Sequence, residues 1–130
     1  MSEVAGNSLE RMLGLLDLFS MDKPVWSTEA MMQATGSTRS TCYRYLKVLQ
    51  AAGFLTPVAQ GAYILGPRII ELDRQLRLRD PIYMAGGPPM KQLASRTGHS
   101  TLLCMLYSDT VMCVREEISP NAPAGLFSRG

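Results

Sequence analysis

The amino-acid sequence predicts a mainly α-helical fold with small β elements, and three observations support this prediction. Two short helical patterns precede a tight turn at Gly36, an amphipathic helix follows over residues 38–50, and a β-hairpin pattern follows that helix. Glycine suits the left-handed backbone of such a turn. A helix-turn-helix closed by a hairpin is a winged helix-turn-helix, which we expect at residues 7–66.

Composition is typical of a small globular protein. The chain has 130 residues, of which 46% are hydrophobic and 18% charged, and its net charge is +2. This length and hydrophobic share are enough to bury one hydrophobic core or two small ones. Residues 36–79 hold seven basic and two acidic side chains, a local balance of +5. That segment could face phosphate groups, although basic residues are common on any soluble surface.

The sequence indicates a cytoplasmic protein. The N-terminus lacks the basic and apolar regions of a signal peptide, and no apolar run approaches the roughly 20 residues that span a bilayer. The three cysteines, Cys42, Cys104 and Cys113, show no CxxC spacing, and His99 is the only histidine. Scattered cysteines of odd number are typical of buried thiols in a reducing cytosol. We therefore expect no metal, no cofactor and no membrane partner.

The first two helices are predicted from caps and periodicity. Asn7 and Glu10 have the spacing of a capping box, and apolar residues then recur at helical spacing to near Ser20. Ser27 or Thr28 caps a second helix.

The third helix has two chemically different faces. Ser37 or Thr38 caps it. The apolar face, expected to pack on the first two helices, holds Cys42, Tyr45, Leu46 and Leu49. The opposite face holds Ser40, Tyr43, Arg44 and Lys47. Hydroxyl groups donate to phosphates, and arginine can read guanine, so this second face suits the major groove.

We interpret the third helix as a recognition helix for double-stranded DNA. Arg39 and Arg44 are the candidates for base or phosphate contacts. The DNA-binding set is completed by Ser37, Thr38, Ser40, Thr41, Tyr43 and Lys47, which would mainly hold the backbone. Two alternatives stay open: an ordinary amphipathic helix with a solvated polar face, and a winged-helix protein-interaction module without sequence-specific DNA binding.

A β-hairpin is predicted after the third helix. Residues 54–58 and 63–65 are strand-like, and Gln60-Gly61 is a turn signal between them. Pro57 suits an edge strand because it lacks an N–H donor. We expect Tyr63 to face the core rather than DNA.

In their order along the chain, these features resemble the IclR-type transcription regulators. The resemblance rests on the capped first helix, the Gly-Ser turn, the STxxR recognition helix, AAGFL, and a wing ending in YILGPRIIEL. It runs from about Leu9 to the end and is strongest over residues 27–72. It implies a bacterial DNA-binding regulator and not an enzyme, and the nucleophile pattern GxSxG is absent from the sequence.

The resemblance implies a linker helix at residues 67–80, where Pro67 fits the first helical position. Its apolar residues are Ile69, Ile70, Leu72, Leu76 and Leu78. Such a helix needs a partner, and in the family the linker helices pair in a dimer. We favour a homodimer, and packing of the helix on its own domain is the alternative. The full family architecture also implies a tetramer.

Residues 81–130 resemble the start of the family's effector-binding domain, which makes this part an incomplete α/β domain. We expect a loop or hinge at residues 84–90, a helix from Pro88 to Thr97, and strands at residues 100–107 and 111–117. Cys104 and Cys113 are expected in the core of this part.

A small-molecule effector is implied, with an incomplete pocket, because the family's effector contacts lie mostly beyond this sequence. Family members continue past Gly130. An engineered fragment, a truncated product and a divergent short member therefore stay open.

Overall fold

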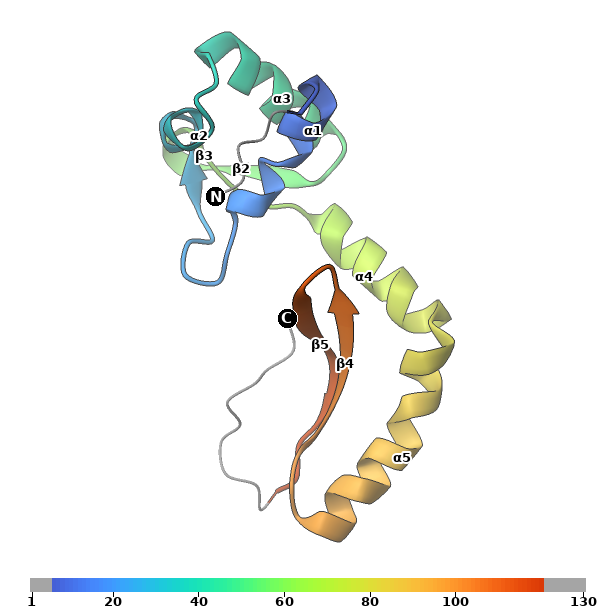
Figure 1. Ribbon diagram of the computed structural model, residues 1–130. Coiled ribbons are helices and arrows are strands. Elements are labelled where there is room, and N and C mark those ends of the chain that lie inside the picture. The colour runs from blue at the N-terminus through green and yellow to red at the C-terminus, as the bar shows by residue number, and fades with distance from the viewer. Residues whose placement is uncertain (1–5, 121–130) are drawn as a thin grey trace. The chain divides into compact units, whose positions relative to one another are not determined.

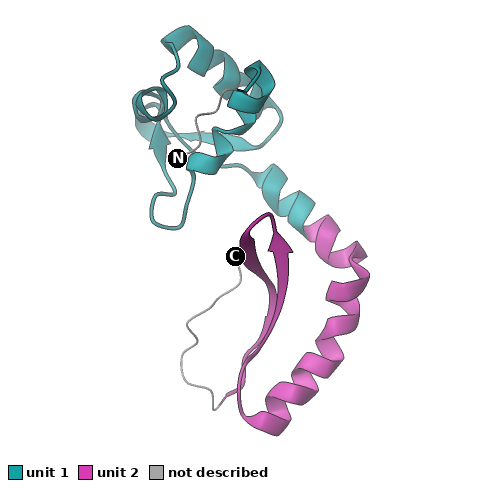
Figure 2. Cartoon of the chain, in the orientation of Figure 1, with its two compact units in different colours: residues 1–73 teal, residues 74–130 magenta. Residues whose placement is uncertain are grey.

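The computed structural model describes residues 6–120. The sequence predicts a loose tail at residues 1–6 and a loop at residues 125–130; except for Gly6, both lie outside the described residues. The chain divides into two compact units, residues 1–73 and 74–130 (Figure 2). The division falls within helix α4 (Pro67–Arg79), which begins at the expected Pro67 and ends one residue before the expected end of the linker.

Unit 1 combines three α-helices with a small antiparallel sheet (Figure 1). The helices that precede α4 are α1 (Ser8–Leu13), α2 (Thr28–Thr35) and α3 (Arg39–Ala51), and the strands are β1 (Trp26–Ser27), β2 (Leu55–Val58) and β3 (Ala62–Leu65). The strand order is β1-β3-β2. Pro57 lies on the edge strand β2, as the sequence predicted. It is paired with Tyr63 of β3. The short strand β1 was not predicted.

The first helix begins as predicted and ends earlier. The Asn7 side chain accepts two backbone N–H groups, and the Glu10 carboxylate accepts the Asn7 N–H at 3.0 Å, which completes the capping box. The helix ends at Leu13, so the expected end near Ser20 was wrong. A glycine follows directly, and a tighter 3₁₀ turn then runs over Leu16–Leu18. Glycine is a weak helix former, which favours an end here.

The core of unit 1 is built around the apolar face of α3. Its buried residues are Leu15, Met31, Cys42, Tyr45, Leu46, Leu49 and Leu55. All four residues expected on that face are included, so this prediction is confirmed. Tyr63 is partly buried and packs against the same cluster, which confirms that it faces the core.

The wing is joined to the end of α3 by two close backbone contacts. Gly53 has a φ of 78°, and its carbonyl accepts the Arg68 N–H at 3.0 Å. The Gly66 N–H donates to the Phe54 carbonyl at 2.7 Å. A Cβ atom on Gly66 would collide with the Gly53 carbonyl oxygen. Only glycine allows the two chain segments to approach this closely.

Unit 2 consists of the end of α4, helix α5 (Pro81–Thr97) and a hairpin of β4 (Thr101–Tyr107) and β5 (Thr110–Glu117) (Figure 1). The two predicted strands are confirmed to within one residue. The loop expected at residues 84–90 was wrong, because α5 is continuous through both glycines and both prolines of that segment.

Contacts with the hairpin explain why α5 continues through a sequence of low helix propensity. The Asp80 side chain caps the helix by accepting two backbone N–H groups. Gly86 and Gly87 allow the hairpin to come close, because a Cβ on Gly87 would lie 2.6 Å from the Arg115 guanidinium. Tertiary packing thus overrides the local preference of the Gly-Gly-Pro-Pro segment.

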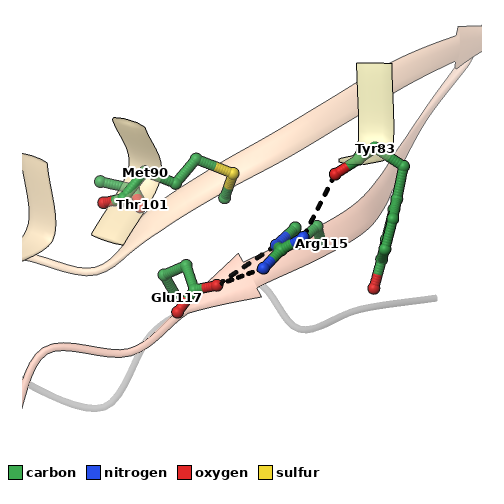
Figure 3. Close-up of polar contacts among 5 residues, drawn as sticks. All are labelled: Tyr83, Met90, Thr101, Arg115 and Glu117. Carbon is green, nitrogen blue, oxygen red and sulfur yellow. Dashed lines mark hydrogen bonds and ion pairs between the residues drawn. The ribbon is translucent and has the colours of Figure 1, made fainter. Parts of the chain in front are cut away.

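Arg115 connects the hairpin to α5 (Figure 3). Its Nη1 atom donates to the Tyr83 carbonyl at 3.2 Å, and its guanidinium lies 5.1 Å from the Tyr83 ring centre. Glu117 holds the same guanidinium at 2.9 Å. Thr101 adds a hydrogen bond to the Met90 carbonyl at 3.1 Å. The hairpin therefore donates two hydrogen bonds to the backbone of a helix whose prolines donate none.

The two cysteines of the hairpin differ in exposure. Cys113 is buried, as expected, whereas Cys104 is exposed and its expected place in the core was wrong. The reason is that a two-stranded hairpin with one helix covers few of its side chains.

Replacing Gly66 with alanine tests the junction between the wing and α3. We expect Gly66→Ala to destabilise unit 1 by more than about 2 kcal/mol, because the new methyl group displaces backbone atoms. Gly61→Ala is the control. The φ of 67° at this position would be strained for alanine, but no atom lies within 4 Å of the added Cβ. This substitution should cost about 1 kcal/mol. Urea unfolding measures both, and equal losses would contradict the proposed close contact.

Candidate nucleic-acid interface

The start of α3 is fixed by a glycine turn and a hydroxyl cap. Gly36 ends α2 in the left-handed conformation with a φ of 64°, as predicted. Thr38 then caps α3, and its hydroxyl accepts the Thr41 N–H at 3.4 Å. The first N–H groups of an α-helix have no partner within the helix, and α3 is a helix of 13 residues. This arrangement leaves the N-terminus of α3 suited to an anion.

The buried side of α3 is held by hydrogen bonds as well as apolar contacts. The Tyr45 hydroxyl lies 3.0 Å from the Ser8 hydroxyl, which links α3 to α1. Buried Thr28 donates to the Gly61 carbonyl at 3.2 Å, which links α2 to the wing. Helix, turn and wing are thus positioned relative to one another within unit 1.

The opposite side of α3 is open to solvent. Arg39, Ser40, Tyr43, Arg44 and Lys47 are all exposed. Thr38 is also exposed, whereas Ser37 and Thr41 are half-buried. All eight predicted site residues therefore lie on α3 or in the two residues before it, and none is in the core.

Arg39 already contacts two neighbours at this surface. Its guanidinium lies 3.8 Å from the Glu29 carboxylate and 5.7 Å from the Tyr43 ring centre. The pKa of Arg39 is raised, first by a hydrogen bond with Tyr43 and then by attraction to Tyr43 and Glu29. Both members of the ion pair are exposed, so the pair is weak and a phosphate could replace Glu29.

Arg44 and Lys47 provide the remaining positive charge of the face. The Arg44 guanidinium lies 5.5 Å from the Tyr45 ring centre. Within residues 6–120, no acidic side chain forms an ion pair with either residue. Their charges are therefore available to a polyanion.

Sequence reasoning missed two features of this surface. Glu29, on α2, comes close to Arg39, and the spacing of 10 residues gave no signal of that contact. Gln60, at the exposed tip of the wing, has a φ of 60°. The Gln60-Gly61 pair was recognised as a turn signal, but the residue itself was not included among the site residues.

The described part of the chain shows neither a metal-binding cluster nor a membrane-spanning helix. Among residues 6–120, no group of three or more potential ligands could hold a metal ion, and no helix is long and apolar enough to cross a membrane. The pKa of Cys42 is raised by burial, so its thiol stays protonated near neutral pH and serves as a packing group.

Three helices, a β2–β3 wing and the exposed basic face of α3 define unit 1 as a winged helix-turn-helix. Residues 8–59 match the IclR helix-turn-helix domain. The resemblance to IclR-type transcription regulators is thus confirmed over these residues.

The relatives of this chain are described as transcriptional regulators. The HTH-type transcriptional regulator KipR of Bacillus subtilis is 29% identical over 93 residues, which are 72% of this chain and 37% of that protein. The chain therefore spans well under half of this relative. The name of this relative agrees with the expected class, a transcription regulator.

Solved structures extend the likeness in fold to nearly the whole chain. An IclR family transcriptional regulator from Brucella abortus has a TM-score of 0.77 at 19% identity, and the match covers 92% of this chain and 46% of that one. An IclR homologue from Microbacterium hydrocarbonoxydans, solved with 4-hydroxybenzoate, has a TM-score of 0.71 at 21% identity, covering 95% and 51%. At these identities the likeness concerns the fold alone.

The two faces of α3 should respond differently to truncation. We expect Leu46→Ala to destabilise unit 1 by about 2–5 kcal/mol, because it opens a cavity at a fully buried position. Lys47→Ala, at the next position, should change stability by less than about 0.5 kcal/mol. Urea unfolding followed by circular dichroism measures both. A large loss for Lys47→Ala would show that the basic face is structural.

Proposed function

We propose that the chain is a transcription regulator whose winged helix-turn-helix, residues 7–66, binds operator DNA with α3 in the major groove. The observation that carries this proposal is the division of α3: four buried residues fix it in the core, and its basic and hydroxyl-bearing face is open. A helix held in this way can enter the roughly 12 Å wide major groove without rearranging the core.

The side chains divide into two roles in this proposal. Arg39 and Arg44 contact bases or phosphates, since a guanidinium can bind guanine or a phosphate oxygen in a bidentate way. The backbone is held by Ser37, Thr38, Ser40, Thr41, Tyr43 and Lys47. Arg39 exchanges Glu29 for DNA on binding, which releases the exposed ion pair.

We also propose that α4 pairs with the same helix of a second copy. Ile70 and Leu76 are each 69% exposed, and Leu78 is 54% exposed. Apolar side chains so exposed on one helix favour burial against a partner. A two-fold dimer would place two recognition helices on two half-sites, so the operator would be roughly palindromic.

In the same proposal, residues 67–80 are the linker and residues 81–130 are part of an effector-binding domain of a cytoplasmic regulator. The support is the fold match, which continues past unit 1 over 95% of the chain. The M. hydrocarbonoxydans homologue was solved with 4-hydroxybenzoate, which makes a small organic effector the class to test for this chain.

Salt dependence tests whether nucleic acid is bound at all. Fluorescence anisotropy with a labelled duplex, enriched from a randomised library, should show affinity falling steeply as salt rises, with a log–log slope of about −0.9 per phosphate neutralised. If no duplex shows saturable binding at low salt, the proposal of DNA binding is contradicted and a protein-interaction module is favoured.

Arg44→Ala tests the assigned role of the exposed face. The variant should lose about 1–3 kcal/mol of affinity for the enriched operator, because one guanidinium contact is removed. Arg96→Ala is the matched control: it removes the same charge from an exposed position at the end of α5. If both variants bind like the parent, Arg44 does not contact the operator.

Leu76→Glu tests the dimer. A carboxylate in an apolar helix pair must be desolvated, so the variant should sediment as a monomer at concentrations where the parent is a dimer. Gln75→Glu, also exposed and on the same helix, adds the same charge and should leave the dimer intact. Analytical ultracentrifugation measures both, and a monomeric parent would contradict the pairing.

A further inference from the structure

Two cysteines lie directly opposite each other in the hairpin of unit 2. Cys104 on β4 is paired in register with Cys113 on β5. The strands are joined by two residues, 108–109, and the pair Tyr107–Thr110 closes the turn. In a two-residue hairpin the closing pair is hydrogen-bonded, and the pair types then alternate along the ladder. Cys104 and Cys113 therefore form a non-hydrogen-bonded pair, in which side chains come closest.

This position has the geometry of a disulfide site. Residues of a non-hydrogen-bonded antiparallel pair have Cα atoms about 4.5 Å apart, within the roughly 4.4–6.8 Å range of disulfides. Both thiols are free. The neighbouring Cys104 thiol is also one of the groups that raise the pKa of Cys113, after burial, which is in keeping with their proximity.

The two thiols differ in their access to solvent. Cys104 is exposed, so a dissolved oxidant can reach it, whereas only 8% of Cys113 is exposed. A buried thiol with a raised pKa reacts slowly as a first nucleophile. Cys42, the third cysteine, is fully buried in the core of unit 1. The structure thus provides one accessible thiol with one sheltered thiol beside it.

We propose that Cys104 and Cys113 form a redox site that hydroperoxides oxidise to a reversible disulfide within the hairpin. The Cys104 thiol releases its proton, its thiolate attacks one oxygen of hydrogen peroxide, and the O–O bond breaks to give sulfenic acid and hydroxide. The hydroxide takes up the released proton as one water. The Cys113 sulfur then attacks the Cys104 sulfur and the S–O bond breaks. The leaving hydroxide takes the Cys113 proton as a second water. Two thiols lose two electrons, and a dithiol reductant restores them by exchange.

Oxidation acts at the point where the hairpin is tied to α5. The Cys113 thiol donates to the Arg115 carbonyl at 3.4 Å, and a register shift lies beside Cys104 in the ladder. A disulfide removes this donor. Arg115 is the residue that bonds the Tyr83 carbonyl of α5 (Figure 3), so the local change occurs two residues from that contact.

Mass spectrometry of the intact chain after treatment with hydrogen peroxide tests this site. We expect a loss of about 2 Da per monomer, the mass of the two hydrogen atoms removed. One thiol, that of Cys42, should stay titratable in denaturant. Tryptic residues 97–115 contain both cysteines, and cleavage before Asp109 should leave the two halves joined until dithiothreitol separates them. When the chain is unfolded in urea, the same oxidation should no longer favour the Cys104–Cys113 disulfide over disulfides that involve Cys42.

Serine variants separate the two roles. Cys104→Ser should slow the loss of the Cys113 thiol by about tenfold or more, because the exposed partner is gone. Cys113→Ser should leave Cys104 as a sulfenic acid that dimedone traps. Phenylarsine oxide, which bridges two adjacent thiols, should bind the native parent once per chain and leave one free thiol. In the folded chain, failure to bridge, disulfides only between chains, or any disulfide of Cys42 would overturn the proposal.

Discussion

Burial of one face of α3 is the interaction on which the rest of unit 1 depends. Leu46 is fully buried and Leu49 is 2% exposed, and each such side chain contributes about 1.5–3 kcal/mol when removed from water. The buried core residues outside α3 come from the α1 region, α2 and β2, so the wing and both preceding helices meet on this helix. Because the apolar face must be covered, the basic face is presented to solvent.

Glycine sets the geometry at both ends of α3. Gly36 turns the chain from α2 into α3 with a φ of 64°, and Gly53 leaves α3 with a φ of 78°. Gly66 then lets the end of the wing approach Gly53 more closely than any side chain would permit. The exposed face therefore lies between a fixed turn and a fixed wing, and it does not need to become ordered when a ligand binds.

The sequence was sufficient to predict the three helices of unit 1, the wing and both faces of α3, because caps, turn glycines and periodic burial are local signals. Strand β1 was missed because two residues carry no alternation, and its pairing with β3 is a long-range contact. The early end of α1 was missed because the apolar period continues past Leu13 while the backbone tightens to a 3₁₀ turn. The Arg39–Glu29 contact likewise depends on how two helices pack, so it became visible only in the structure.

Helix α5 shows where local signals fail most clearly. Its segment Gly86-Gly87-Pro88-Pro89 combines the two poorest helix formers, and each proline also removes a backbone donor. The helix is nevertheless continuous, because Gly87 makes room for Arg115 and the hairpin donates to the helix backbone at Tyr83 and Met90. A helix that depends in this way on a neighbouring hairpin responds to changes in the hairpin. In unit 2, α5 and the β4–β5 hairpin therefore form one packed unit. The contacts that join them cannot be predicted from the local sequence of either element.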